Sequence, residues 1–301
     1  MSRFTPQVRS QHPSHRHLKR TLRSQPFRAI IRLGSKTTTA TAYPGKTASQ
    51  LARVVEINTV QSINNSSNKL LMKRCFTRGN VKTAEWFQGQ TRQELLNWAN
   101  DRYPIISKSH HGSRGEGNAK HDNRESLERF LNTHNMGNYI FEKFYNFNRE
   151  YRLHVTRNGC FYTCRKMLRD GTPDNQRWFR NDTNSVWIMD TNPQFNRPAN
   201  WNAIVAECVK ALNAVGLDIG GFDVKVQSGQ DRRGRNRETT DFIIIESNSA
   251  CSHGEVTAVK YREELNRLLD AKAANYVQTA DERVLGRTTK AQKPQKRLVR
   301  R

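Results

Sequence analysis

Three oxygen-bearing side chains stand out because they lie on two short apolar segments late in the chain. Residues 220–226 (Gly-Gly-Phe-Asp-Val-Lys-Val) and 241–248 (Asp-Phe-Ile-Ile-Ile-Glu-Ser-Asn) have the composition of buried strands, joined by a polar, glycine-containing stretch that suits a hairpin loop. If the strands pair antiparallel, Asp223 and Glu246 can face the same side, and the two-residue period puts Asn248 there too. A carboxylate in an apolar strand is costly without a partner, and hard oxygen ligands suit magnesium bound with nucleotide phosphates. We therefore predict that these three residues bind Mg²⁺, with Mn²⁺ as an alternative ion.

A second segment has the features of a phosphate-binding loop. Residues 104–117 (Pro-Ile-Ile-Ser-Lys-Ser-His-His-Gly-Ser-Arg-Gly-Glu-Gly) predict a strand that ends near Lys108, followed by a flexible loop. Glycines permit a close approach of the backbone to phosphate, a hydroxyl adds a donor and the lysine adds charge; the loop residues concerned are Gly112, Ser113, Gly115 and Gly117. The loop lacks the Gly-Lys-Ser/Thr ending of a Walker loop, and no helix opens on it as in a dinucleotide fingerprint. A simple hairpin turn is the alternative interpretation.

The elements that must position these groups follow from the spacing of apolar residues. Besides the two strands above, we expect strands at residues 27–34, 54–57, 103–108, 139–144, 150–155 and 159–167. We expect helices at residues 68–79, 91–100, 126–132, 199–215 and 258–274, of which 199–215 is the most clearly amphipathic. Strands and helices interleave without a strict βαβ period, which predicts an α+β protein.

The charge of the chain is concentrated at its ends. The 301 residues carry a net charge of +24, and neither residues 1–20 nor residues 287–301 contain an acid. We therefore predict disordered basic tails at residues 1–25 and 279–301. These tails can serve one of two roles: nonspecific contact with nucleic acid or another polyanion, or solubility alone. The sequence favours neither role, because no aromatic residues lie between the charges to stack bases.

The cysteines and the hydropathy pattern bear on the cellular compartment. Five cysteines without regular pairing argue against a disulfide framework and favour a reducing cytoplasm. No apolar run is long enough to span a membrane, and the first residues lack the apolar core of a signal peptide. A cytoplasmic protein is therefore expected.

The order of these segments resembles the ATP-grasp enzymes, in particular the phage-encoded relatives of the RimK, glutathione synthetase and D-alanine–D-alanine ligase group. The resemblance runs from about residue 64 to residue 269. It implies two α/β subdomains that clasp ATP within residues 67–278, with a mobile phosphate-loop subdomain at about 80–138. Residues 26–66 would then be a reduced N-terminal segment on the substrate side.

The resemblance also implies roles for individual residues. Lys73 and Lys108 resemble the lysines that contact nucleotide phosphate, and Glu150 resembles the acid that binds ribose. The segment Glu142, Lys143 and Phe144 resembles the hinge strand that hydrogen-bonds adenine through its backbone. Arg152 and Arg165 resemble arginines near the transferred phosphate, which would make them the catalytic pair. The sequence Cys251-Ser252-His253 departs from the Pro-Gly that often follows the second metal motif, and we expect the loop histidine to face solvent.

The implied activity is that of an ATP- and Mg²⁺-dependent ligase, active in the host cytoplasm if phage-encoded. ATP would convert a carboxylate to an acyl phosphate, and an amine or thiol, for instance of an amino acid or peptide, would then displace phosphate, with ADP as the other product. Two alternatives stay open: an ATP-grasp phosphotransferase, and a basic nucleic-acid-binding protein with a degenerate ATP site. The presence of Asp223, Glu246, Asn248, Lys73 and Lys108 argues against the second alternative.

Overall fold

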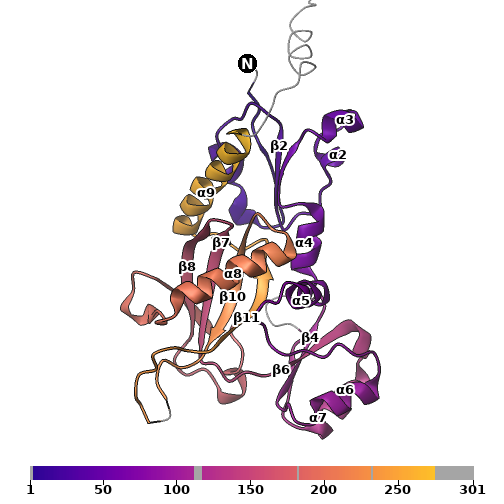
Figure 1. The fold of residues 1–301 in the computed structure, drawn as a ribbon, viewed down its shortest axis with the longest axis vertical. Coiled ribbons are helices and arrows are strands. Elements are labelled where there is room, and N and C mark those ends of the chain that lie inside the picture. The colour runs from indigo at the N-terminus through magenta and orange to yellow at the C-terminus, as the bar shows by residue number, and fades with distance from the viewer. Residues whose placement is uncertain (1–2, 112–116, 182, 232, 275–301) are drawn as a thin grey trace, which may run out of the picture.

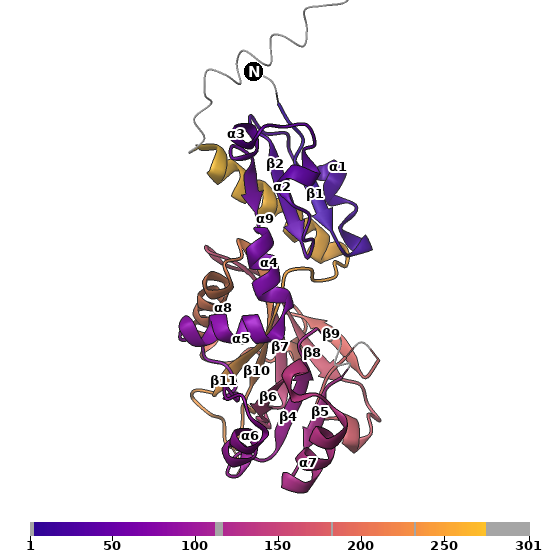
Figure 2. The same ribbon diagram turned by 90° about the vertical axis from the view of Figure 1, so that its right-hand side faces the viewer.

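The strands form three separate sheets that follow one another along the long axis of the molecule (Figures 1 and 2). The computed structural model describes residues 3–111, 117–181, 183–231 and 233–274. An N-terminal sheet lies at one end, a five-stranded sheet in the middle and a small sheet at the other end. The predicted tail at residues 279–301 lies outside the described residues. No helix among the described residues is long and apolar enough to cross a membrane.

The N-terminal sheet is parallel and contains β1 (Gln7–Ser10), β2 (Ala29–Leu33) and β3 (Val55–Ile57). Four short helices belong to this region: η1 (Pro13–His15), α1 (Leu18–Thr21), α2 (Thr39–Ala42) and α3 (Ala48–Leu51). The long helix α9 (Glu255–Ala274) comes from the other end of the chain and packs here, because Tyr261, Leu265 and Leu269 share a core with the strands. The two predicted strands and the last helix are confirmed within a few residues.

The prediction of a disordered tail at residues 1–25 is wrong for the part that the structure describes. Residues 3–25 form β1, η1 and α1, and the side chains of Val8, Leu18 and Leu22 are buried in the core that α9 completes. A few apolar residues among many charges suffice to order this segment, since their partners come from a helix some 240 residues later and hydrophobic burial is the main favourable term. The N-terminal domain is therefore larger than the predicted residues 26–66.

The central sheet is antiparallel and has the strand order β11-β10-β7-β8-β9. Its strands are β7 (Arg149–Thr156), β8 (Gly159–Leu168), β9 (Ser185–Met189), β10 (Ile219–Val226) and β11 (Phe242–Asn248), with η3 (Asp174–Gln176) and η4 (Pro193–Phe195) in connections. Helices α8 (Trp201–Val215), α4 (Val60–Ser67) and α5 (Lys69–Arg78) pack on one face. That face carries Tyr151, Leu153, Phe222 and Val224, whose side chains join the largest hydrophobic core. None of these three helices packs on the other face, where α9 contacts β8.

The small lobe consists of β4 (Ile105–Ser109), β5 (Ala119–His121) and β6 (Tyr139–Lys143) with α6 (Arg92–Ala99), η2 (Met136–Asn138) and α7 (Arg124–Thr133). Helix α6 begins where predicted, because Thr91 and Glu94 form a capping box. Leu95, Ile105 and Phe141 belong to the separate core of this lobe. This lobe covers the residues of the subdomain predicted at about 80–138 and also includes β6.

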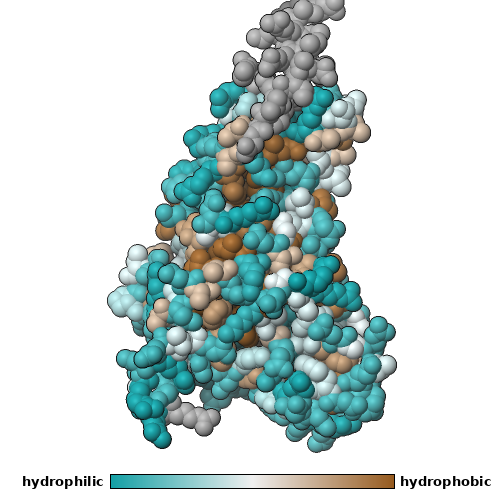
Figure 3. All heavy atoms as spheres, in the orientation of Figure 1, coloured by the Kyte–Doolittle hydropathy of each residue, from teal (hydrophilic) through white to brown (hydrophobic). Residues whose placement is uncertain are grey.

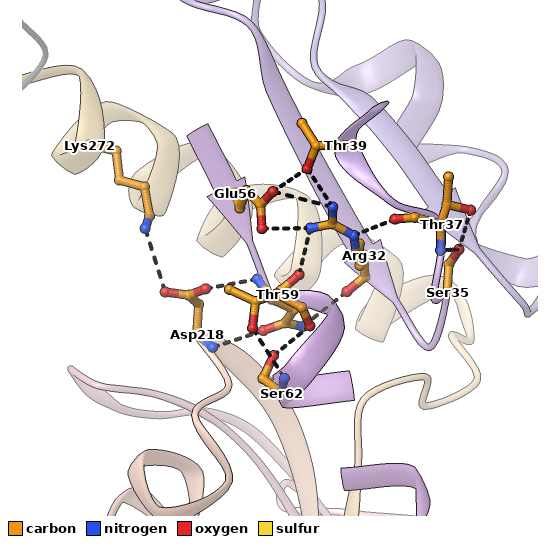
Figure 4. A network of polar contacts seen from close by, with 10 residues as sticks. Arg32, Ser35, Thr37, Thr39, Glu56, Thr59, Ser62, Asp218 and Lys272 are labelled. Carbon is orange, nitrogen blue, oxygen red and sulfur yellow. Dashed lines mark hydrogen bonds and ion pairs between the residues drawn. The ribbon is translucent and has the colours of Figure 1, made fainter. Parts of the chain in front are cut away.

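A polar network joins the N-terminal domain to the central sheet (Figure 4). Asn58, in the left-handed region at φ 57°, accepts hydrogen bonds from the Asp218 and Ile219 amides and donates to the carbonyls of Arg32 and Ile219. The fully buried Arg32 donates to Glu56 Oε2 at 3.1 Å, so its charge has a partner. These contacts hold the N-terminal domain at the end of the central sheet where β10 begins.

Candidate active site

A cavity of about 320 Å³ lies between the small lobe and the face of the central sheet opposite α4, α5 and α8. Its wall from the small lobe includes Ile106, Lys108 and Glu142, whereas β10 and β11 contribute Asp223 and Glu246. Most of the predicted site residues therefore meet here, although they are spread over more than 140 positions of the sequence.

The register of the sheet arranges the polar side chains of the cavity wall in transverse rows. Because strand residues alternate between faces, partners in register on neighbouring strands share one face. The three rows, running from β11 or β10 toward β9, are Asn248–Gly221–His154–Tyr162, Glu246–Asp223–Arg152–Cys164–Met189 and Lys225–Glu150–Lys166–Trp187. The predicted common face of Asp223, Glu246 and Asn248 is thus confirmed in its geometry.

The middle row holds two carboxylates with different partners. Asp223 receives two hydrogen bonds from Arg152, 2.6 Å from Nε and 2.8 Å from Nη2. Burial acts to raise the pKa of Asp223, but the Arg152 guanidinium outweighs it and the pKa lies below its ordinary value. The pKa of Glu246 is raised instead, first by burial and then by the charge of Asp223. The row therefore carries one carboxylate with a bidentate partner beside one whose burial and whose neighbour Asp223 outweigh the nearby charges of Lys69 and Lys108.

This donor set fits a magnesium ion. Two adjacent carboxylates and an amide supply hard oxygen atoms, and Mg²⁺ is held by one or two carboxylates with substrate phosphates completing its shell. The raised pKa of Glu246 shows that a nearby cation would be favourable. Within the described part of the chain, no cluster of three or more His, Cys, Asp or Glu side chains could hold a metal by itself. Asp223 keeps free lone pairs despite its contact with Arg152.

Lys73 and Lys108 flank one buried carboxylate, but only one of them reaches the cavity. Glu142 lies 2.8 Å from Lys73 Nζ and 2.6 Å from Lys108 Nζ. Burial opposes ionisation of Glu142, yet the charges of Lys108 and Lys73 lower its pKa to about 2. Lys73 is fully buried and also donates to Thr83, so it does not line the cavity as predicted for a phosphate contact. Lys69, one helical turn earlier on α5, takes the cavity position.

The third row places Glu150, the predicted ribose acid, in a dense group of charges. Arg180 Nη1 lies 3.5 Å from Glu150, and both Lys225 and Lys166 are its partners across the sheet. Burial lowers the pKa of Lys225 to about 8 although Glu150 acts in the opposite sense. All four side chains line the cavity, so one acid is shared among three cations.

The two predicted catalytic arginines lie on different faces of the sheet. Arg152 lines the cavity and sits 4.8 Å over the Trp187 ring, whereas Arg165 lies near Tyr151 on the side of α8 and donates to the Gln194 carbonyl at 2.6 Å. The placement predicted for Arg165 is therefore wrong, because the adjacent residue in a strand points the other way. Lys166 faces the cavity in its place.

The predicted hinge strand lines the cavity with Glu142, Lys143 and Phe144. Its amides are already in use, since Lys143 N–H donates to the Glu85 carbonyl and Phe144 N–H to the Pro104 carbonyl. An adenine contact through this segment must use other backbone groups. Apolar and aromatic side chains complete a wall for a flat ring: Ile106, Phe144, Trp178, Phe179, Ile243 and Ile245.

Three of the predicted loop residues, Gly112, Ser113 and Gly115, lie outside the described residues. Gly117 is described and has φ 71°, a conformation that side chains rarely adopt. Asn118, the next residue, lines the cavity. The described end of the predicted loop therefore lies beside the cavity.

The sequence analysis missed a group of histidines beside the cavity. The ring of His253 lies 4.2 Å from that of His15 and 4.0 Å from that of Tyr261, and His15 Nε2 is 2.7 Å from the Cys251 carbonyl. His253 is thus packed against the N-terminal domain and does not face solvent as expected. The closely spaced His12, His15 and His17 were the only signal, and they had been assigned to a tail. His12 lines the cavity and brings the N-terminal domain to its edge.

Comparisons with known proteins identify the fold. No family model matches the chain, and no curated protein matches it in sequence. Among solved structures, biotin carboxylase from Campylobacter jejuni superposes with a TM-score of 0.54 at 16% identity, over 84% of this chain and 56% of that one. D-alanine–D-alanine ligase from Bacillus anthracis gives 0.51 at 12% identity, over 81% and 77% of the two chains. The ATP-grasp ligase PsnB, complexed with minimal precursor, Mg and ADP, gives 0.52 at 12% identity over 81% and 77%.

These similarities show that the chain has the ATP-grasp fold, as the sequence analysis expected. The chain spans only about half the length of the biotin carboxylase and 53% of a carboxyaminoimidazole ribonucleotide synthase from Aspergillus clavatus. The finer resemblance to phage-encoded relatives stays a prediction.

Proposed function

We propose that this protein is an ATP- and Mg²⁺-dependent ligase that activates a carboxylate as an acyl phosphate and joins it to an amine or a thiol. The observation that supports this most is the charge arrangement of the cavity. Asp223 and Glu246 stand in one row of the central sheet, and Lys108 enters from the small lobe. Such a cavity provides both anionic ligands for a metal and cationic ligands for phosphate. The ligases among the solved structures that share this fold support the same class of reaction.

The small lobe and the sheet divide the binding of ATP between them. We assign the phosphates to Lys108 and Lys69, which line the cavity near Glu246. Glu142 holds Lys108 in place through its 2.6 Å ion pair. The apolar wall formed with Phe144 would cover the base, and Glu150 would accept hydrogen bonds from the ribose hydroxyls. The loop around Gly112, Ser113 and Gly115 would close over the phosphates.

The metal would be bound by Asp223, Glu246 and Asn248. A bound magnesium ion supplies positive charge to the phosphate oxygens and aligns them for in-line transfer. Arg152, held by Asp223 and by the Trp187 ring, is oriented in advance beside the place where the charge of the transferred group develops. Lys166, 5.1 Å over the same ring, adds a second cation for the acceptor carboxylate.

The reaction has two steps. A carboxylate oxygen attacks the γ-phosphorus of ATP, the bond to the bridging oxygen of ADP breaks, and an acyl phosphate forms. The nitrogen or sulfur of the second substrate then attacks the acyl carbon, phosphate leaves, and the proton of the nucleophile passes to solvent. Arg152 and Lys166 would neutralise the transferred phosphoryl group in both steps. The resemblance to phage-encoded relatives supports a reaction in the host cytoplasm, with an amino acid or peptide as substrate.

Trapping the intermediate tests this proposal. Hydroxylamine should convert the acyl phosphate to a hydroxamate in the presence of ATP, Mg²⁺ and a carboxylate from an amino acid pool or host lysate. Lys166→Gln should reduce hydroxamate formation, whereas Arg165→Gln, which changes the adjacent residue on the other face, should retain it. ATP consumption that yields a stable phosphorylated product and no hydroxamate would show a phosphotransferase instead. Absence of any Mg²⁺-dependent ATP binding would show a degenerate site.

A further inference from the structure

A second cavity lies on the opposite side of the central sheet from the active site. Its volume is about 470 Å³, and it is bounded by the starts of β7 and α8, by β8 and by the β10–β11 loop. Four of its lining residues are arginines, Arg149, Arg165, Arg197 and Arg237, and none is an Asp or a Glu. We call this cavity the arginine groove. Its composition contrasts with the active-site cavity, whose charged lining residues include both acids and bases.

Three of the four guanidinium groups in the arginine groove have no carboxylate partner among the described residues. Arg149, which is only 4% exposed, donates to the Gln227 carbonyl at 2.7 and 2.9 Å. Arg237 likewise donates to the Gln230 carbonyl. Carbonyl oxygens satisfy N–H groups but leave the positive charge uncompensated. Only Arg197 has an acid, Asp190, at 3.6 Å in an exposed pair.

Arg165 has a guanidinium group whose hydrogen-bonding capacity is only partly used. Its Nη1 donates to the Gln194 carbonyl, but its buried Nε has no hydrogen-bond partner. Burial lowers the pKa of Arg165, the nearby Tyr151 acts to raise it, and the charges of Arg149 and Arg180 act to lower it further. Like charges held together in a cavity are unfavourable unless an anion joins them.

The start of α8 adds to the positive potential at the edge of the groove. Asn200 does not cap this 15-residue helix, because its side chain exchanges hydrogen bonds with Thr240 at 2.9 and 3.0 Å. The first backbone N–H groups of the helix follow Ala199, which lines the groove. The uncapped positive end of a helix dipole favours a bound anion.

We propose that the arginine groove binds the phosphate group of a ligand, independently of the ATP cavity. Arginine forks match the oxygen geometry of phosphate, and such charge-assisted hydrogen bonds are the strong ones. The ligand supplies the negative charge that the groove lacks. The phosphate can belong to a small phosphate ester or to a nucleic-acid backbone, because both present the same oxygens. The hydrophilic β10–β11 loop, which projects at the lower left in Figures 1 and 3, adds the exposed Arg233 beside the groove, whereas Arg235 is paired with Asp231 at 2.8 Å.

The experiment uses the full chain and two probes. Inorganic phosphate is titrated by calorimetry, and a labelled single-stranded oligonucleotide by fluorescence anisotropy, at low salt. The test protein is the double variant Arg165→Gln/Arg237→Gln, in which both changed side chains reach the groove and neither belongs to the ATP cavity. The control is Arg129→Gln, which removes the same charge from an exposed ion pair with Glu125 on α7. Lys108→Gln identifies phosphate that binds in the ATP cavity.

We expect the double variant to bind phosphate about tenfold more weakly or worse, as for the loss of charge-assisted hydrogen bonds worth about 1.4 kcal/mol or more. Arg129→Gln and Lys108→Gln should retain phosphate binding in the groove.

The two probes distinguish the sources of the phosphate. If the oligonucleotide loses affinity in parallel and free phosphate competes with it, the natural source is nucleic acid. If only phosphate binding is lost, the source is a small phosphate compound. Equal phosphate binding by the double variant and the wild type, or an equal loss in Arg129→Gln, would overturn the proposal. Unchanged thermal unfolding of each variant shows that the fold is intact.

Discussion

The two cavities of this protein share strands β7 and β8 but differ in how their charges are balanced. Arg149 and Arg165 face the arginine groove, and their neighbours in sequence, Glu150 and Lys166, face the active site. In the active site most cations have an acid beside them, such as Arg152 with Asp223 and Lys108 with Glu142. In the groove the guanidinium groups contact mainly carbonyl oxygens. Paired charges fix side chains in advance for chemistry, whereas unpaired charges indicate a ligand that brings its own charge.

The largest effect should follow from changing the metal-binding row. Glu246→Gln should reduce Mg²⁺-dependent ATP turnover by at least about a hundredfold, the scale of losing a preorganised charge in an active site. Its thermal stability should be unchanged or higher, because burial and Asp223 raise the pKa of Glu246 and so disfavour its charged form. Asp223→Asn should lose turnover as well but also lower the melting temperature, since Arg152 is then left without its carboxylate. A Glu246→Gln protein with wild-type turnover would contradict the metal assignment.

Variants of the two lysines around Glu142 should affect protein stability and ATP binding to different extents. Lys73→Met removes a fully buried ion-pair partner and should cost about 3–5 kcal/mol in the free energy of unfolding. Lys108→Met removes a side chain that reaches the cavity, so it should weaken ATP binding more and stability less. Urea unfolding and equilibrium ATP binding measure the two effects. Equal behaviour of the two variants would show that Lys73 contacts phosphate after all.

Adjacent residues on β8 test whether the two cavities are independent. Lys166→Gln should lower ATP-dependent product formation roughly tenfold, and leave phosphate binding in the groove at its wild-type affinity. Arg165→Gln should do the reverse, because the neighbouring residue belongs to the other face. Steady-state turnover and phosphate calorimetry on both proteins measure these opposite effects. A loss of both properties in either variant would indicate that the cavities are coupled through the sheet.

The smallest effect should be a pH dependence of stability from the histidine group. Burial lowers the pKa of His15 from 6.5 to about 4, and burial followed by the neighbouring histidines lowers that of His253 to about 2. Both rings are therefore neutral in the folded protein while the unfolded chain takes up protons below pH 6.5. The stability is present above pH 6.5 and is lost as the pH falls from there toward about 4.

Thermal unfolding at pH 7.5 and pH 5 measures this loss. Neither ring nitrogen of His253 has a hydrogen-bond partner, so His253→Phe should keep the ring packing and show a smaller drop between the two pH values. An identical drop in the variant would place the acid sensitivity elsewhere.

Local patterns sufficed for most of the central sheet and for the metal row. Apolar runs bounded by glycine, together with the period of two, placed Asp223 and Glu246 on one face, and the register then made them direct partners. The cap at Thr91 is equally local and was visible in the sequence. Short strands such as β5 and β9 were missed because three to five residues give too weak a pattern.

By itself, the sequence determined most strands of the central sheet, the amphipathic helices and the common face of Asp223 and Glu246, since these depend on residues that are neighbours along the chain. Only the tertiary structure decided that Lys69 and not Lys73 reaches the cavity, that Lys166 and not Arg165 faces it, and that α9 orders the N-terminal residues. The physical reason is the same in each case. Burial and charge pairing are set by partners that lie far apart in sequence, and no local pattern contains the position of those partners.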